Sequence, residues 1–299
     1  MELLSPKIDV VFKALFSSAD SEDILTDFLA SVLDIENSDI KNIKIINTEI
    51  LPEAADQKYS RLDIAMEVDD RIINVEMQIK KLTDYRERVL FYWSKLYAKD
   101  LRKNESYKEL KQTISINVLD YKMFDCEECH SVFMLRETNR GELLTDKCRF
   151  DFLELPKADS DSRQVKRLKR WLKFFNLESE EDAEMIAQAN DTVMNKAVFI
   201  LKKMSADDKM REAARIRERA LHDEASYLED ARNEGIEEGI GIGRAEGRAE
   251  GRAEGRAEGI EEGIDIGIEK GIDIGIAHIL ENLRALGADE ELLKKAAMQ

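Results

Sequence analysis

The sequence predicts an α/β protein in which one mixed β-sheet is flanked by helices and is followed by a helical region and a long glycine-repeat tail. Up to residue 155, short runs of β-branched residues alternate with helical patterns, which is typical of a domain built around one sheet. After Pro156 the apolar residues recur at helical spacing, and 13 of the 14 glycines follow residue 234. We therefore expect three regions, at residues 1–160, 161–233 and 234–299.

The spacing of apolar residues predicts the elements in turn. Apolar residues three and four apart predict a helix over 8–33, and an aromatic-rich stretch predicts another over 85–101. The short polar turn Asp69-Asp70-Arg71 predicts that two strands form a hairpin. Strands are expected at 43–51, 62–68, 72–79, 113–119, 131–135 and 148–155. Later helices are expected at 162–176, 181–204, 207–233, 276–286 and 290–297.

The balance of charged and apolar residues limits the class of protein. The chain carries 46 basic and 63 acidic residues, a formal net charge of −17, and its 43% of hydrophobic residues is enough for a packed core. No apolar run approaches the roughly 20 residues that span a bilayer, and the N-terminus lacks the pattern of a signal peptide. Three cysteines exclude a disulfide framework. We expect a cytoplasmic protein that does not contact membranes.

Acidic and amide side chains on the predicted hairpin are the main candidates for chemistry. Asp63 lies early in one strand, while Glu76 and Gln78 are two residues apart in the next and share a face. A hairpin places Asp63 beside Glu76, and two neighbouring carboxylates repel unless a cation lies between them. Such oxygen ligands suit Mg²⁺ or Mn²⁺, which activates water and neutralises the charge of a phosphate. The alternative is an ordinary polar strand face, and the spacing alone favours that alternative.

Six short segments of the first half, taken together, fit a known pattern. They are Ser5–Lys13, Ser60–Asp63, Asn74–Gln78, Tyr92–Tyr97, His130–Phe133 and Phe152–Lys157. With them the sequence resembles the PD-(D/E)XK nuclease superfamily and, within it, the recombination-promoting nucleases, a family related to transposases. The resemblance covers residues 5–160. It implies a PD-(D/E)XK nuclease-like fold, a DNA endonuclease activity with a role in recombination, and Mg²⁺ or Mn²⁺ as cofactor.

The resemblance also assigns roles to residues of the hairpin. Asp63 matches the Asp of the PD motif, although Leu62 stands in place of its Pro, and Glu76 matches the (D/E) position. Asp63, Glu76 and the carbonyl of Met77 are thereby implied as metal ligands. Gln78 takes the position of the motif's Lys, so its amide orients water without supplying positive charge. Members of the family commonly carry Gln there, so the chain is expected to be active.

Because Gln78 carries no positive charge, lysines elsewhere are expected to supply it. Lys80 lies on the same face as Gln78, and Lys13 lies on the first helix, four residues after Asp9. Asp9 and Lys13 are expected at the rim of the site, with an ordinary surface ion pair as the alternative. Glu49, in the first expected strand, is a further acidic candidate.

Cations on two predicted helices are candidates for contact with DNA phosphates. Arg88 and Lys95 follow the hairpin on the aromatic-rich helix, where packing is the alternative role. The stretch 163–173 has six cations in eleven residues. Its candidate phosphate ligands are Lys166, Arg167 and Arg170, and the alternative is the solvated face of an amphipathic helix.

The segment Cys126-Glu-Glu-Cys-His130 matches two metal-related patterns. It has the spacing of a c-type haem attachment site, and Cys148 would complete a Cys₃His zinc set. Haem attachment requires export, for which the sequence shows no signal, and the resemblance does not require the cysteines. Coincidence is the favoured interpretation.

The tail has a glycine at every fourth position from Gly235 to Gly275, and Arg-Ala-Glu-Gly repeats four times within it. Each glycine costs a helix about 1 kcal/mol relative to alanine, and like charges recur four residues apart, so a lone helix is marginal. We therefore expect the tail to form a homo-oligomer, most simply a dimer, with a mobile extension as the alternative. A second hypothesis for the whole chain is a catalytically degenerate nuclease fold that acts as an oligomeric interaction protein.

Overall fold

The chain divides by its contacts into two compact units, residues 1–222 and 223–299. A computed structural model describes residues 2–46, 49–50, 60–99, 101, 106–159, 166–187 and 191–286. The described strands and the helices α1 to α6 belong to the first unit, and α7 (Asp208–Ala285) continues into the second.

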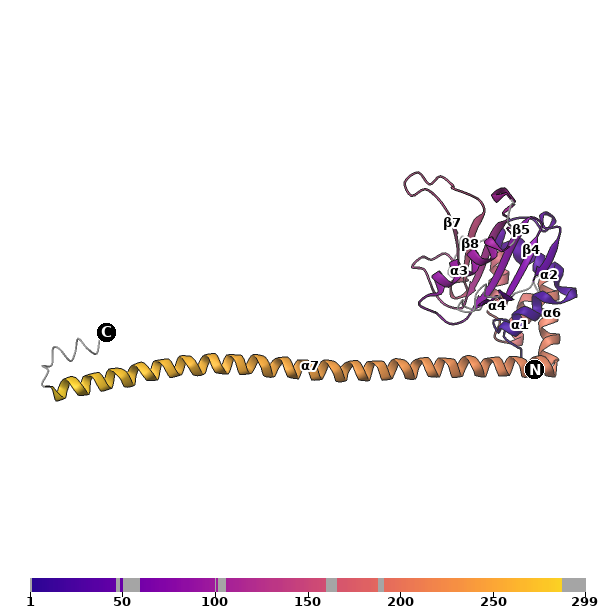
Figure 1. The fold of residues 1–299 in the computed structure, drawn as a ribbon. Coiled ribbons are helices and arrows are strands. Elements are labelled where there is room, and N and C mark those ends of the chain that lie inside the picture. Colours follow the sequence, from indigo (N-terminus) through magenta and orange to yellow (C-terminus); the bar gives the residue numbers. More distant parts are fainter. Residues whose placement is uncertain are drawn as a thin grey trace. The chain divides into compact units, whose positions relative to one another are not determined.

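Six strands of the first unit form one mixed sheet (Figure 1). In sheet order they are β1 (Ile43–Ile46), β4 (Ile64–Val68), β5 (Arg71–Gln78), β6 (Gln112–Leu119), β8 (Cys148–Glu154) and β7 (His130–Met134). β5, β6 and β8 run parallel, whereas the pairs β1–β4, β4–β5 and β7–β8 are antiparallel. β2 (Glu49–Ile50) and β3 (Ser60–Arg61) form a separate pair, so the strand expected over 43–51 is divided between β1 and β2. The expected hairpin is present as β4 and β5, and Asp69 in its turn has a φ of 51°.

The first unit also contains six α-helices among its described residues. They are α1 (Asp9–Ser17), α2 (Glu22–Leu33), α3 (Tyr85–Ala98), α4 (Lys166–Phe175), α5 (Glu180–Ala187) and α6 (Thr192–Ala206). The helix expected over 8–33 is two helices, because the extended backbone of Ser18 (φ −76°, ψ 147°) ends α1. The separate helices expected at 207–233 and 276–286 are parts of the continuous α7, and residues 290–297 lie outside the described chain. None of the described helices has both the length and the apolar composition needed to cross a membrane.

The alternation of side chains along β5 gives the sheet two different faces. Ile73 and Val75 point into the main core, which α1, α2, α4 and α6 cover. Ile72 packs with Leu96 of α3 on the opposite face, and Glu76 shares that face because it is four residues further along the strand. The main core contains an aromatic cluster of Phe12, Phe16, Phe28, Trp171 and Phe175. One face of the sheet is therefore apolar, and the other carries the acidic residues of the hairpin under α3.

The cations of α4 bind aspartates within the first unit. Arg167 donates from Nη2 to Asp27 Oδ1 at 2.8 Å, and Trp171 Nε1 donates to Oδ2 of the same carboxylate at 2.8 Å. Arg170 forms an ion pair with Asp191. Arg167 and Arg170 were candidates for contact with DNA phosphates, with the solvated face of an amphipathic helix as the alternative. Both side chains instead pair with aspartates of the same unit. Lys166 is exposed at the start of the helix.

The buried carboxylate of Asp27 gives a test of this packing. Asp27→Ala is expected to lower the free energy of unfolding by about 3 kcal/mol, because it leaves Arg167 without its anionic partner and Trp171 Nε1 without its acceptor. The matched control is Asp23→Ala, whose partner Lys196 is 39% exposed and whose loss should cost less than about 1 kcal/mol. Urea unfolding followed by tryptophan fluorescence measures both. Equal losses in the two variants would contradict the structural role of α4.

Candidate functional site

The register of β4 and β5 brings Asp63 and Glu76 together. Ile64 lies opposite Val75 in this antiparallel pair. Asp63, which precedes Ile64, therefore faces Glu76, which follows Val75. The backbone N–H of Asp63 donates to Glu76 Oε1 at 3.2 Å, and the backbone N–H of Met77 donates to Asp63 Oδ2 at 2.9 Å. The two carboxylates are therefore joined through the backbone of the strands that carry them.

Glu76 lies in a strongly desolvated position. It is 7% exposed, and burial raises its pKa to about 8, with the charge of Asp63 adding to the effect. The side chain of Asn74, which donates to Glu76 Oε1 at 3.2 Å, acts in the opposite direction, as do the backbone N–H of Asp63 and the charge of Arg88. In the absence of a further cation, Glu76 therefore holds a proton at neutral pH.

Of the two lysines proposed to replace the motif's Lys, Lys13 is the one that reaches Asp63. Its Nζ lies 3.2 Å from Asp63 Oδ1. Lys80 instead donates from Nζ to the carbonyl of Leu221, and its own carbonyl accepts from Gln78 Nε2 at 2.7 Å.

Asp9 lies on α1, one turn before Lys13, and has a partner on α7. Arg217 Nε lies 2.9 Å from its Oδ2. An ion pair between Asp9 and Lys13 was the alternative to a place at the rim of the site, and the structure pairs the two residues with Arg217 and Asp63 instead.

Helix α3 adds Tyr85, a polar side chain that the sequence did not single out, and it also carries Arg88, which was a candidate for contact with DNA phosphates. The hydroxyl of Tyr85 donates to Asn117 Oδ1 of β6 at 3.1 Å, and Tyr85 is close enough to Glu76 for that charge to help burial raise its pKa. Arg88 lies one turn further, with its guanidinium 5.1 Å from the centre of the Tyr92 ring. A signal existed in the sequence, since an asparagine such as Asn117 inside a buried strand requires polar partners.

Several other candidates lie apart from the carboxylate pair or are not fully described. Lys95 stands over the ring of Phe91 at 5.9 Å, further along α3. Glu49 is part of β2, and its side chain lies outside the described chain.

The cysteines of the Cys126 to His130 segment do not gather into a metal site in the described part of the chain. No group of three or more potential His, Cys, Asp or Glu ligands occurs there. Cys129 and Cys148 are buried in separate apolar clusters, and His130 Nε2 lies 2.8 Å from Asp151 Oδ1. Coincidence therefore stays the prediction for the spacing of this segment.

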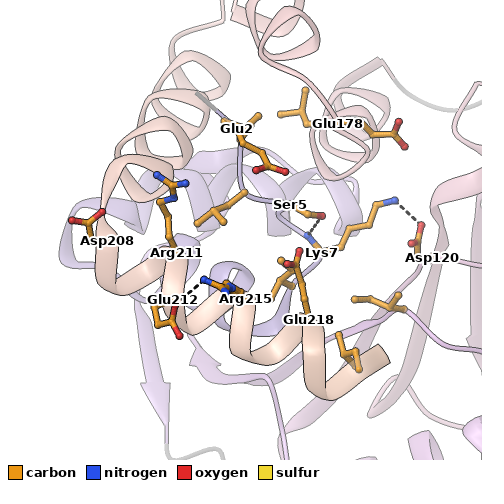
Figure 2. Close-up of a pocket in the computed structure, with 16 residues that line it drawn as sticks. Glu2, Ser5, Lys7, Asp120, Glu178, Asp208, Arg211, Glu212, Arg215 and Glu218 are labelled. Atoms are coloured by element: carbon orange, nitrogen blue, oxygen red, sulfur yellow. Dashed lines mark hydrogen bonds and ion pairs between the residues drawn. The ribbon is translucent and has the colours of Figure 1, made fainter. Parts of the chain in front are cut away.

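A cavity of about 960 Å³ lies between the N-terminal segment and the first turns of α7 (Figure 2). Six carboxylates and three cations line it, and among them Lys7 Nζ pairs with Asp120 Oδ1 at 2.7 Å. Neither Asp63 nor Glu76 is part of its lining. Its excess of carboxylates does not suit a phosphate, so we do not assign it to the candidate site.

The carboxylate oxygens of Asp63 and Glu76 are suitable ligands for a hard divalent cation. The site offers two carboxylates, and no described residue donates a hydrogen bond to Glu76 Oε2. Mg²⁺ typically binds one or two carboxylates together with water and substrate phosphate, and it needs no larger cluster of protein ligands. Binding of such a cation would favour the ionised form of Glu76, against the burial and the charge of Asp63 that raise its pKa.

The raised pKa of Glu76 predicts how stability depends on pH when no metal is bound. Between about pH 5 and 8 the folded protein keeps a proton that the unfolded chain has lost, so stability falls as pH rises and levels off above about 8. The expected slope is about 1.4 kcal/mol per pH unit. Urea unfolding in chelator measures it, with Glu76→Gln as the variant that lacks this contribution. If the two proteins show the same pH dependence, Glu76 is not the buried acid described here.

Comparison with known proteins gives one match. A search of curated proteins and a search of solved structures each returned no match. A family model described as PD-(D/E)XK nuclease family transposase matches residues 6–231, which include Asp63, Glu76 and the whole six-stranded sheet. The match covers more than half of the chain and agrees with the mixed sheet and flanking helices of the first unit. The chain belongs to the PD-(D/E)XK nuclease family transposases.

Proposed function

We propose that this protein is a metal-dependent DNA endonuclease in which Asp63, Glu76 and Gln78 are the catalytic residues. The observation that carries the proposal is the pairing of Asp63 with Glu76 on adjoining strands, within a family of nucleases. Glu76 is buried beside the partly exposed Asp63, and two neighbouring carboxylates repel unless a cation lies between them. Their presence together therefore favours a functional role over a polar strand face.

Each residue of the site has a distinct task in this proposal. Asp63, Glu76 and the Met77 carbonyl hold Mg²⁺ or Mn²⁺, which when bound supplies an activated water and neutralises phosphate charge. Gln78 donates from Nε2 to the carbonyl of Lys80, which leaves its Oε1 to accept a hydrogen bond from the attacking water. Lys13 supplies the positive charge that the motif's lysine would bring, because it lies 3.2 Å from Asp63.

Arg88 and Lys95 are the proposed contacts to DNA phosphates. Arg88 is close enough to Glu76 to lower that group's pKa, so it lies beside the reacting centre. Lys95 is two turns further along the same helix and would reach a flanking phosphate. Arg167 and Arg170 of α4 are not part of this surface because aspartates of the same unit bind them, whereas the exposed Lys166 stays a candidate.

Removal of the Asp63 carboxylate tests the assignment. Asp63→Ala is expected to lower Mg²⁺-dependent nicking of supercoiled plasmid by about 10³-fold or more, because it removes a metal ligand. Gln78→Ala is expected to slow nicking by a smaller factor, roughly 10- to 100-fold. Asp23→Ala, which removes an exposed carboxylate, is the control. Full activity of Asp63→Ala protein would show that the site is elsewhere.

The non-catalytic alternative predicts a different result in the same preparation. A degenerate fold would not cleave DNA with Mg²⁺ or Mn²⁺, and calorimetry would find no metal affinity that depends on Asp63. Metal binding that disappears in Asp63→Ala protein therefore separates the endonuclease from the interaction protein.

We also propose that the second unit joins two copies of the chain. Apart from the partly buried Ile276, the isoleucines of α7 between residues 236 and 279 are 49% to 65% exposed. A Cβ added at any described glycine of the repeat would meet nothing within 4 Å. A four-residue repeat follows the i, i+4 ridges of a helix, and two such ridges pack at a crossing angle of about −50°. Small residues allow close approach there, and the alternating Arg and Glu of the repeat can pair between copies.

Two variants test this association. Truncation after Asn233 is expected to lower the mass found by light scattering to that of a monomer. Replacement of Gly247, Gly251, Gly255 and Gly259 by Ala should raise helix propensity by about 1 kcal/mol at each position, yet weaken association because methyl groups block close approach. Circular dichroism and light scattering record the two effects separately. If full-length protein is a monomer at tens of micromolar (roughly where weak association is visible), the proposal is wrong.

A further inference from the structure

Two hydrogen-bond donors on the α3 face of the sheet have no acceptor among the described residues. They are Arg88 Nε and the hydroxyl of Tyr121, and both atoms are buried. A buried donor without a partner costs stability, so native proteins rarely keep one without a bound group to satisfy it. Two such donors next to a candidate catalytic centre therefore indicate a place for an acceptor-bearing ligand.

Arg88 acts electrostatically on both Tyr121 and Glu76. The guanidinium of Arg88 is near enough to lower the pKa of Tyr121, although burial dominates and raises that pKa to about 12. The charges of Glu76, Tyr121 and Arg88 all contribute to the pKa of Tyr85, so the three groups lie within electrostatic range of the same side chain of α3. With its pKa near 12, the Tyr121 hydroxyl is a donor at neutral pH.

Neighbouring carboxylates do not satisfy these donors. Glu154 is the carboxylate whose charge helps to raise the pKa of Tyr121. Its Oε2 accepts from Lys157 Nζ at 2.6 Å, and its Oε1 accepts from the backbone N–H of Phe124 at 3.2 Å. Arg170 and Arg217 also have an Nε without a hydrogen bond, yet each forms an ion pair with an aspartate. Within the described part of the chain, Arg88 has no such ion pair.

The topology explains why these groups meet. β5 and β6 run parallel and end together, with Gln78 opposite Leu119. Tyr121 follows the end of β6 by two residues, and Gln78 is the last residue of β5. Ligands of sheets with parallel strands bind at the carboxyl ends of those strands, so Tyr121 lies at the edge where a substrate of the Glu76 site would pass.

We propose that Tyr121 and Arg88 together bind one phosphate of the substrate strand, next to the phosphodiester that is cleaved. The planar fork of Arg matches phosphate oxygens, and a tyrosine hydroxyl adds a further donor without adding charge. The inference rests on the proposed endonuclease function and adds a substrate-binding residue, Tyr121, that neither the sequence motif nor the family description assigns.

The chain provides a matched pair of tyrosines for the test. Tyr121→Phe removes a hydroxyl that has no protein acceptor, so its melting temperature should be unchanged or higher, while its KM for a short duplex should rise about tenfold with little change in kcat. Tyr85→Phe removes a hydroxyl that is bonded to Asn117, so its melting temperature should fall by about 3 °C. An unchanged KM in Tyr121→Phe protein, or a loss of melting temperature equal to that of Tyr85→Phe, overturns the inference.

Substrates with one neutralised phosphate identify the contact. Each phosphate around a mapped cleavage position is replaced in turn by an uncharged methylphosphonate. At one position the wild-type KM should rise about tenfold, and there the Tyr121→Phe variant should lose less than about twofold further, because the two changes remove the same interaction. Additive losses at every position contradict a shared contact. If the wild-type protein cleaves no DNA with Mg²⁺ or Mn²⁺, the proposed function itself fails, which is a different outcome.

Discussion

The desolvated contact between Asp63 and Glu76 is costly, and groups from other elements of the first unit stabilise it. The β4–β5 register places two acids opposite each other, and a slip of either strand by one residue would move its acid to the apolar face and separate the pair. Several groups reduce the cost of this contact. The backbone of Met77 binds Asp63, Lys13 adds an opposite charge, and Asn74 binds Glu76. These groups come from β5 and α1, so the site depends on the core that fixes α1 against the sheet.

The two faces of the sheet divide structure from chemistry. On one face, aromatic residues of α1, α2 and α4 pack closely, and an aspartate of α2 holds the cations of α4. On the other, a single helix, α3, covers strands that carry Asn74, Glu76 and Asn117. Buried polar groups require partners, and α3 supplies Tyr85 to Asn117. The buried hydroxyl of Tyr121 has no hydrogen-bond partner among the described residues, which indicates that a ligand supplies the acceptor.

The local pattern of the sequence was sufficient to predict the elements that depend on neighbours in the chain. The Asp69-Asp70-Arg71 turn predicted the hairpin, and the hairpin predicted that Asp63 meets Glu76, as the structure shows. Tyr121 could not be predicted in this way, because it reaches the site only through the parallel pairing of β6 with β5, a contact distant in sequence. The partner of Arg167 on α4 could not be predicted for a similar reason. Spacing shows which side chains share a helix face, but it does not show that Asp27 of α2 lies opposite that face.

The net charge of −17 does not conflict with a DNA substrate when the charges near the site are considered. Residues 234–299, which lie in the second unit, carry a net charge of −8, nearly half of the total. Mobile ions screen charges beyond about 8 to 10 Å at physiological salt, so a phosphate at the site responds mainly to its immediate neighbours. Those neighbours include Lys13 and Arg88, and Glu76 is itself protonated at neutral pH before a cation binds. A bound divalent cation would displace that proton and balance the charges of both carboxylates, so the local charge becomes less negative by one unit and favours phosphate more when the metal is present.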